Sequence, residues 1–252
     1  MKKFAIITLF PEMFEKVLGQ SMMWKASVIG AAEFHIINLR EFGIGPHKRV
    51  DDTVYGGGDG MLLKPEPLFA AIEYAKKVLE PTPQGPLTPP AAAALPFSPC
   101  DIDSKTTQDP NCKVVLTSPR GTTWSQSLAR KSASDATQNL IIVCGHYEGV
   151  DERVLSVVDQ QISIGDYVLT GGELPAMVMI DSIVRLLPNV LGGETSAEIE
   201  SFSDGDNLEY PQYTHPAAFT TPSGEELSVP DILLSGNHAA IAKWRAENAP
   251  KR

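Results

Sequence analysis

Short runs of apolar residues alternate with longer stretches of helical periodicity along most of the chain. The apolar runs predict strands at 3–10, 34–39, 113–117 and 140–144. One helix is expected to begin at Pro11, and further helices are expected at 65–79, 150–158, 174–187 and 237–247. This alternation is typical of an α/β domain with a mostly parallel sheet.

One predicted helix, 174–187, is apolar on nearly every face, which indicates burial by the core or by a partner subunit. Residues 164–169 (IGDYVL) have the composition of a strand. Residues 40–63 are rich in glycine and favour a loop.

Two stretches interrupt the pattern. Residues 81–112 contain eight of the chain's 20 prolines and a run of four alanines, which is typical of a disordered insertion. Residues 192–206 are small, polar and acidic, and they favour a flexible linker. We therefore expect a main domain over 1–191 and a small helical domain over 207–252.

The composition, 42% hydrophobic and 21% charged, is ordinary for a globular protein. No apolar run approaches the roughly 20 residues that span a membrane. The opening MKKFAIITLF ends at Pro11 without a cleavage site, so it favours a first strand over a signal peptide. Three cysteines cannot all pair within the chain, and Cys144 lies in an apolar run, so a reduced, cytoplasmic location is expected.

The net charge of −10 argues against a polyanionic partner unless basic residues gather on one face. Small basic clusters occur at His47-Lys48-Arg49, Arg120, Arg130-Lys131, Lys243 with Arg245, and Lys251-Arg252. Such clusters are more often solvated surface than binding patches, so charge alone leaves the substrate open.

Three glycine-containing segments are candidates for ligand binding. VDDTVYGGGDGM (50–61) permits close backbone approach, but Met61 stands where a P-loop needs lysine, so a tight turn is the simpler interpretation. CGHYEGVDER (144–153) lacks the G-x-G-x-x-G spacing of a dinucleotide fold. Its Glu148 and Asp151 suit a ribose or an amino group, or simply a helix cap. SIGDYVLTGGELPAM (163–177) offers backbone groups that could bind an adenine edge.

These segments, together with LTSPRG and the linker SAEIESFSDG, closely resemble the bacterial tRNA (guanine-N1)-methyltransferases. The resemblance covers nearly the whole chain apart from 81–112. It implies a SPOUT methyltransferase with a C-terminal trefoil knot, which the general rule against threaded chains would not have predicted. It also implies transfer of a methyl group from S-adenosylmethionine to N1 of guanosine 37 of tRNA.

The resemblance implies that three loops, 116–119, 145–151 and 164–175, hold S-adenosylmethionine. Adenine would meet backbone groups of the third loop, and Glu148 would lie near the ribose or the methionine part. The cofactor-binding residues carried over in this way are Leu116, Thr117, Ser118, Pro119, Gly145, Tyr147, Glu148, Gly149, Val150, Asp151, Ile164, Gly165, Asp166, Tyr167, Val168, Leu169, Gly171, Gly172 and Pro175.

N1 of guanine carries a proton, so its methylation needs a general base and stabilisation of negative charge towards O6. By resemblance Glu200 is the base, although relatives usually have aspartate there, and Arg185 is the arginine on the guanine side. Without the resemblance, Glu200 would be a solvated linker acid and Arg185 a partner of Asp181. Further substrate contacts are expected from Glu209, Ser196 and Asp204, of which Asp204 is also the second candidate for the base.

The expected partners are tRNA and a second copy of the chain. The resemblance implies a homodimer whose active site joins the knot of one subunit to the C-terminal domain of the other. Mg²⁺ is a further cofactor candidate, although no residue is assigned as a metal ligand. Gln212 and His215 replace a histidine and an arginine of the family's Pro-His-Tyr-Thr-Arg-Pro segment, which weakens the case for a phosphate contact there.

Two other functions stay open. A SPOUT enzyme acting on another RNA or another base would share the cofactor loops, and an inactive relative could bind cofactor and RNA without turnover. A dehydrogenase is excluded, because no G-x-G-x-x-G follows the first strand.

Overall fold

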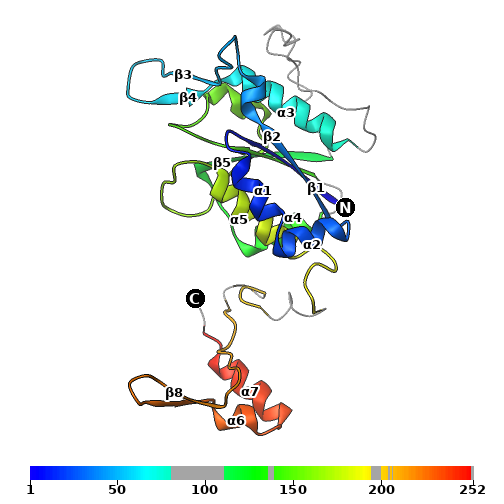
Figure 1. Cartoon of the computed structure of the whole chain (residues 1–252), viewed down its shortest axis with the longest axis vertical. Coiled ribbons are helices and arrows are strands. Elements are labelled where there is room, and N and C mark those ends of the chain that lie inside the picture. The colour runs from blue at the N-terminus through cyan, green and yellow to red at the C-terminus, as the bar shows by residue number, and fades with distance from the viewer. Residues whose placement is uncertain (81–110, 136–138, 194–199, 204, 206, 251–252) are drawn as a thin grey trace. The chain divides into compact units, whose positions relative to one another are not determined.

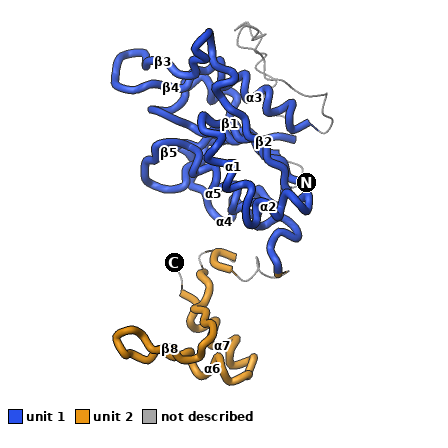
Figure 2. Tube along the Cα trace, viewed as in Figure 1, with its two compact units in different colours: residues 1–192 blue, residues 193–252 orange. Residues whose placement is uncertain are grey.

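The computed structural model of the chain describes residues 1–80, 111–135, 139–193, 200–203, 205 and 207–250. Contacts divide the chain into two compact units, 1–192 and 193–252 (Figure 2). Residues 81–110 of the expected insertion lie outside the described residues, as do 194–199, 204 and 206 of the expected linker. Cys112 begins a strand, so the insertion as predicted extends too far.

The first unit is built on a five-stranded sheet in the order β2-β1-β6-β5-β7 (Figure 1). Every neighbouring pair in this sheet is parallel. The α/β class predicted from the alternating pattern is therefore confirmed. The strands are β1 (Lys2–Thr8), β2 (Ala32–Asn38), β5 (Cys112–Thr123), β6 (Asn139–Cys144) and β7 (Gln160–Ser163).

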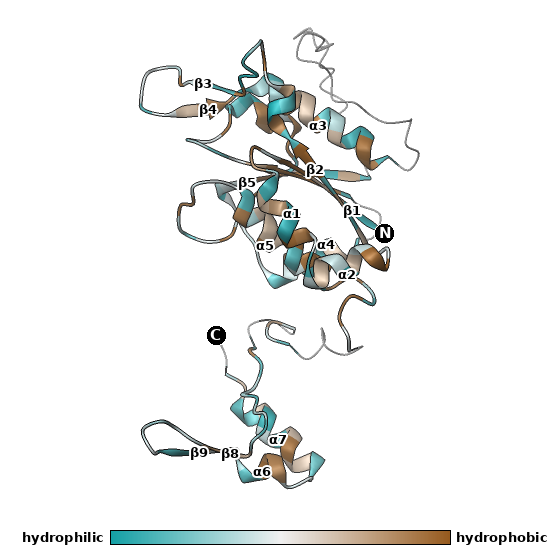
Figure 3. Cartoon of the chain, in the orientation of Figure 1, coloured by the Kyte–Doolittle hydropathy of each residue, from teal (hydrophilic) through white to brown (hydrophobic). Residues whose placement is uncertain are grey.

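Helices cover both faces of this sheet (Figure 1). In β1, Phe4 and Ile6 belong to one apolar cluster and Ala5 and Ile7 to the other, because successive side chains of a strand point to opposite faces. The cluster of Ala5 and Ile7 includes residues of α3 (Pro65–Leu79). The cluster of Phe4 and Ile6 includes residues of α1 (Glu12–Leu18), α2 (Ser21–Val28) and α5 (Glu173–Val184). Burial on both faces explains why the central strands are mainly apolar (Figure 3).

The helices match the pattern where their apolar spacing is strong. The helix predicted at 65–79 has the same bounds as α3, and Pro65 occupies its first turn, where a missing N–H costs no hydrogen bond. The pattern does not predict α2 or α4 (Gln126–Ser134). The residues of α4 are mainly polar and only Ala129 is buried, so the helix has few apolar residues to mark it in the sequence.

Two predictions of local structure are wrong, and a third is right in position but differs in helix type. Residues 40–63 are not simply a loop: they contain the end of a 3₁₀ helix, η1 (Leu39–Phe42), and the antiparallel hairpin of β3 (Asp51–Thr53) and β4 (Met61–Leu63). The helix expected at 150–158 is a 3₁₀ helix, η2 (Glu152–Val157). Residues 164–169 do not form a strand: 164–167 are bends that follow β7, and the Tyr167 N–H donates to the Gly165 carbonyl at 3.0 Å.

The second unit holds a hairpin as well as helices. Its elements are β8 (Ala218–Thr220), β9 (Glu226–Ser228), α6 (Asp231–Leu234) and α7 (His238–Asn248). Expected helix 237–247 corresponds to α7. None of the described residues of this unit is buried. Across the described ranges of the whole chain, no helix is long and apolar enough to cross a membrane.

Candidate functional site

Three loops at the carboxyl ends of neighbouring strands are bonded to one another. The Gly172 N–H, before α5, donates to the Gly145 carbonyl after β6 at 2.7 Å. The Gly145 N–H in turn donates to Thr117 Oγ1 on β5 at 3.2 Å, and His146 forms an isolated bridge with Gly171. These bonds hold three segments that are far apart in the sequence, at Thr117, at 145–146 and at 171–172, around one space.

A cavity of about 530 Å³ lies between these loops, a size that suits a small organic ligand. Every residue predicted to bind the cofactor lines it except Asp151 and Asp166. Its position, at the carboxyl ends of β5, β6 and β7, is where open parallel sheets usually bind ligands. In β5 the pairing with β7 shifts register between Thr117 and Thr122, which leaves the residues between them out of the ladder.

Close backbone packing explains the glycine at 172. A Cβ atom there would lie 2.6 Å from the Gly145 nitrogen and would also strike Thr117 Oγ1. Any side chain at Gly172 would therefore push apart two walls of the cavity.

The β3–β4 hairpin is attached to the second of the three loops. Glu148 N–H donates to the Met61 carbonyl at 3.1 Å, and Leu63 N–H donates to the Gly149 carbonyl at 3.0 Å. A Cβ atom at Gly60 would lie 2.9 Å from Glu148 Oε1. The VDDTVYGGGDGM segment is thus not an isolated turn, because its end packs directly on a carboxylate that lines the cavity.

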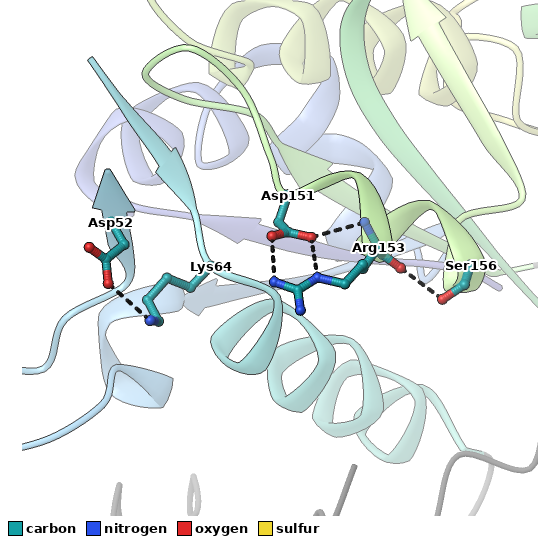
Figure 4. Close-up of polar contacts among 5 residues, drawn as sticks. All are labelled: Asp52, Lys64, Asp151, Arg153 and Ser156. Atoms are coloured by element: carbon teal, nitrogen blue, oxygen red, sulfur yellow. Dashed lines mark hydrogen bonds and ion pairs between the residues drawn. The ribbon is translucent and has the colours of Figure 1, made fainter. Parts of the chain in front are cut away.

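The Asp151 carboxylate faces the Arg153 guanidinium (Figure 4), and Asp151 does not line the cavity. Its carboxylate accepts two hydrogen bonds of 2.8 Å from the Arg153 guanidinium and one of 3.0 Å from the Arg153 backbone. These bonds hold the pKa of Asp151 below its usual range. The sequence leaves open whether Asp151 binds a ribose or an amino group or caps a helix. Its contacts are those of a cap at the start of η2. Nearby, Lys64 and Asp52 form a separate ion pair at 3.2 Å (Figure 4).

The sequence prediction omits several residues that line the cavity. Arg120 and Glu152 form an ion pair of 2.8 Å at its edge, and both side chains are more than half exposed. These two and His146 lie inside the quoted motifs, so motif membership could have identified them. Leu62 comes from the distant hairpin and has no local signal. The remaining omitted residues are Ile162, Ser163 and Thr170.

Tyr147 and Cys144 have shifted acidities at this site. Burial, together with the charge of Asp51, raises the pKa of Tyr147, whose backbone adopts a φ of 56°. Burial raises the pKa of the Cys144 thiol well above its usual range. Cys144 is buried, as its apolar surroundings in the sequence predict, and it is a free thiol. A thiol of this kind is unreactive.

Of the residues predicted for catalysis and substrate binding, Arg185 belongs to the first unit, and it does not line this cavity. Arg185 follows the last residue of α5 and is half-buried, and its N–H donates to the Asp181 carbonyl at 3.1 Å. Glu200 and Glu209 belong to the second unit and are described only within it. Glu209 N–H donates to Ser201 Oγ at 3.0 Å. Ser196 and Asp204 lie outside the described residues.

The second unit has an aromatic pocket of its own. It measures about 360 Å³ and is lined by Tyr210, Tyr213 and Arg245 among others. The Arg245 guanidinium lies 4.6 Å from the centre of the Tyr210 ring. In the described part of the chain, no three His, Cys, Asp or Glu side chains gather as metal ligands.

Comparison with known proteins identifies the family. Residues 1–96 and 97–252 match the family model of tRNA (Guanine-1)-methyltransferase TrmD. The chain is 46% identical to a tRNA (guanine-N(1)-)-methyltransferase of Halalkalibacterium halodurans, over 99% of this chain and 87% of the relative. It is 44% identical to one of Nostoc punctiforme (97% and 87% covered) and 45% identical to one of a Sulfurihydrogenibium species (99% and 84% covered). The chain therefore belongs to the TrmD family of tRNA (guanine-1)-methyltransferases.

Proposed function

We propose that this protein transfers a methyl group from S-adenosylmethionine to N1 of guanosine 37 in tRNA. The observation that carries the proposal is the cavity at the ends of β5, β6 and β7, lined by nearly all residues that the resemblance assigns to the cofactor. Membership of the family and the names of the relatives support the tRNA substrate and the guanine acceptor.

The walls of the cavity suit the parts of S-adenosylmethionine. The backbone of Ile164, Gly165 and Leu169 offers donors and acceptors for an adenine edge. Because Gly172 has no side chain, a ligand could approach the main chain closely there. Glu148 is an exposed carboxylate at the rim and suits a ribose hydroxyl or the amino group of the methionine part. When bound, the sulfonium supplies an electrophilic methyl group.

The chain supplies a base and a cation for the acceptor. Glu200 takes the proton from N1 of guanine, and Arg185 stabilises the negative charge that develops towards O6. The N1–methyl bond then forms as the sulfur–methyl bond breaks, and the electron pair of the broken bond stays on sulfur. Glu200 has one methylene more than the aspartate usual in relatives, which changes its reach but not its chemistry. Glu209, Ser196 and Asp204 would contact the target nucleotide.

We also propose a homodimer, in which the C-terminal domain of one subunit completes the site of the other. The support is a set of four exposed apolar side chains. They form two pairs, each spaced four residues apart on one helix, and the two helices contact each other. Met13 and Val17 lie on α1, and Leu174 and Val178 on α5, each between 41% and 51% exposed. Such a surface is costly in water and is typical of an interface.

The trefoil knot and a cytoplasmic location complete the proposal. The knot rests on the resemblance, which assigns to the knotted region the loop after β6 and the segment after β7, two segments that are bonded to each other. A cytoplasmic location agrees with the buried free thiols of Cys112 and Cys144.

The test is methyl transfer from labelled S-adenosylmethionine to tRNA transcripts carrying guanine or adenine at position 37, with and without a chelator to detect a Mg²⁺ requirement. Transfer to the guanine transcript alone is expected. Glu200→Gln should abolish turnover while the affinity for S-adenosylmethionine stays within about twofold, because the base contacts only the acceptor. Equal transfer to both transcripts would support an enzyme of other specificity, and cofactor and tRNA binding without transfer would support an inactive relative.

A further inference from the structure

A buried carboxylate lies behind the wall of the cavity. Glu173 is the first residue of α5, and it is only 3% exposed. It does not line the cavity, but its neighbours Gly171, Gly172 and Pro175 do. A Cβ atom on Gly171 would collide with Glu173 Oε2 and would lie 2.8 Å from His146 Nδ1. The carboxylate therefore lies directly beside Gly171, a residue of the cavity wall.

The hydrogen bonds around Glu173 are directed towards its oxygen. Thr8, fully buried at the end of β1, accepts a hydrogen bond of 2.9 Å from Phe10 N–H. Its own hydroxyl hydrogen then points to Glu173 Oε1 at 2.8 Å. This arrangement stabilises a carboxylate that accepts hydrogen bonds, and the N-terminus of α5 favours negative charge at the same position.

No cation within the described ranges pairs with this carboxylate. The ion pairs of the described residues all lie elsewhere, and His146 Nδ1 is buried without a hydrogen-bond partner. The field of the carboxylate reaches the end of β6, since Glu173 adds to the effect of burial in raising the pKa of Cys144. A buried charge is screened far less than one in water.

We infer that Glu173 is a specificity-determining residue that favours a cationic ligand in the cavity over a neutral one. The inference rests on the proposed function, in which a sulfonium donor enters and a neutral thioether leaves. Methyl transfer removes the positive charge from sulfur, so an anionic wall stabilises the donor more than the product. Glu173 thereby lowers inhibition by S-adenosylhomocysteine, whereas the exposed Glu148 contributes through direct contact.

The test measures ligand affinities rather than activity. Isothermal titration at pH 8, where an ordinary histidine is neutral, compares S-adenosylmethionine and its amine analogue sinefungin with S-adenosylhomocysteine. In Glu173→Gln, which keeps size and hydrogen bonding, the affinity of both cationic ligands relative to S-adenosylhomocysteine should fall roughly tenfold. The matched control is Glu66→Gln, an exposed carboxylate in the first turn of α3, which should leave the ratio unchanged.

The outcomes separate the inference from the function on which it rests. An equal loss of affinity for all three ligands in Glu173→Gln would show a structural role only and would overturn the inference. If Glu173→Gln does not fold, the wild-type ratio is measured between 0.1 and 1 M salt. If the preference for cationic ligands comes from a buried carboxylate, this affinity ratio should change by less than about twofold. A ratio that falls towards one at high salt would show that exposed acids cause the preference. Failure of the wild-type protein to bind any of the ligands would contradict the proposed function itself.

Discussion

The N–H of Gly172 donates a hydrogen bond of 2.7 Å to the carbonyl of Gly145, and these two residues precede α5 and follow β6. The bond joins two loops that are separated by 27 positions and places both against Thr117 of β5. Because a Cβ atom at Gly172 would lie 2.6 Å from the Gly145 nitrogen, this contact depends on glycine. The loops of the cavity are thus held together by contacts between their main chains.

Gly172→Ala tests that dependence. The added methyl group should separate the loops, lower the free energy of unfolding by about 1–3 kcal/mol and weaken binding of S-adenosylmethionine. Thermal unfolding and isothermal titration measure the two effects. Gly192→Ala is the control, because a Cβ atom at Gly192 would meet nothing within 4 Å. Unchanged donor affinity in Gly172→Ala would contradict the assignment of the cavity to the donor.

Gly60→Ala tests the contact between the hairpin and Glu148. A Cβ atom at Gly60 collides with the Glu148 side chain, so the substitution should displace that carboxylate and reduce donor affinity roughly tenfold, as loss of a charged hydrogen bond does. Gly58→Ala is a matched control: both glycines have positive φ, but a Cβ atom at Gly58 meets nothing within 4 Å. Equal effects of the two substitutions on titrated affinity would show that backbone strain alone is responsible.

Lys2 gives a prediction on pH and stability. Its ammonium is buried against the last carbonyls of α4, at 2.6 Å from Ser132 O and 2.8 Å from Asp135 O. Burial lowers the pKa of Lys2 from 10.5 to about 8, although the charge of Asp135 opposes the shift. The unfolded chain therefore binds more protons between pH 8 and 10.5, so the contribution of Lys2 to the free energy of unfolding rises with pH across this window.

Denaturant unfolding at several pH values measures this rise. The difference between wild type and Lys2→Met should grow from pH 8 to 10.5 with a slope of at most about 1.4 kcal/mol per pH unit. Lys3→Met, which keeps Lys2, should retain the wild-type profile. A difference that is flat over the window would show that Lys2 keeps its ordinary acidity in the folded protein.

Val178→Glu tests the proposed dimer. A charge in the exposed apolar surface of α1 and α5 should prevent burial of that surface. Light scattering should then give a mass near 27.2 kDa instead of twice that value. Val28→Glu, at an exposed valine of α2 outside the proposed interface, should remain dimeric. A wild-type protein that is monomeric at micromolar concentration would contradict the proposed dimer.

The sequence predicts the parallel sheet because its strands are buried on both faces and read as unbroken apolar runs, as in LIIVC of β6. It predicts α3 because Pro65 and a regular apolar spacing mark its start and its buried face. The sequence does not predict helix α4, because this helix has little apolar surface. The sequence does not predict the β3–β4 hairpin either, because its strands have three residues each and are held by tertiary bonds to Gly149 and Glu148.

The candidate site could be predicted in part for a similar reason. Glycines mark the loops of the cavity because the main chain packs closely there, and this signal is local. Leu62 and the buried Glu173 carry no such signal, since their positions depend on how distant segments meet. The composition of the IGDYVL segment predicts a strand, but the chain bends there, and the Ser163 hydroxyl and the Gly165 backbone bond to each other.

The most direct measurement locates the methyl group on the acceptor. A guanine-37 tRNA transcript is treated with the protein and S-adenosylmethionine, digested to nucleosides and short fragments, and analysed by mass spectrometry against nucleoside standards. The account predicts 1-methylguanosine in the fragment that contains position 37, and none with Glu200→Gln. A methyl group on another atom or another nucleotide, or none in the wild-type reaction, would contradict it.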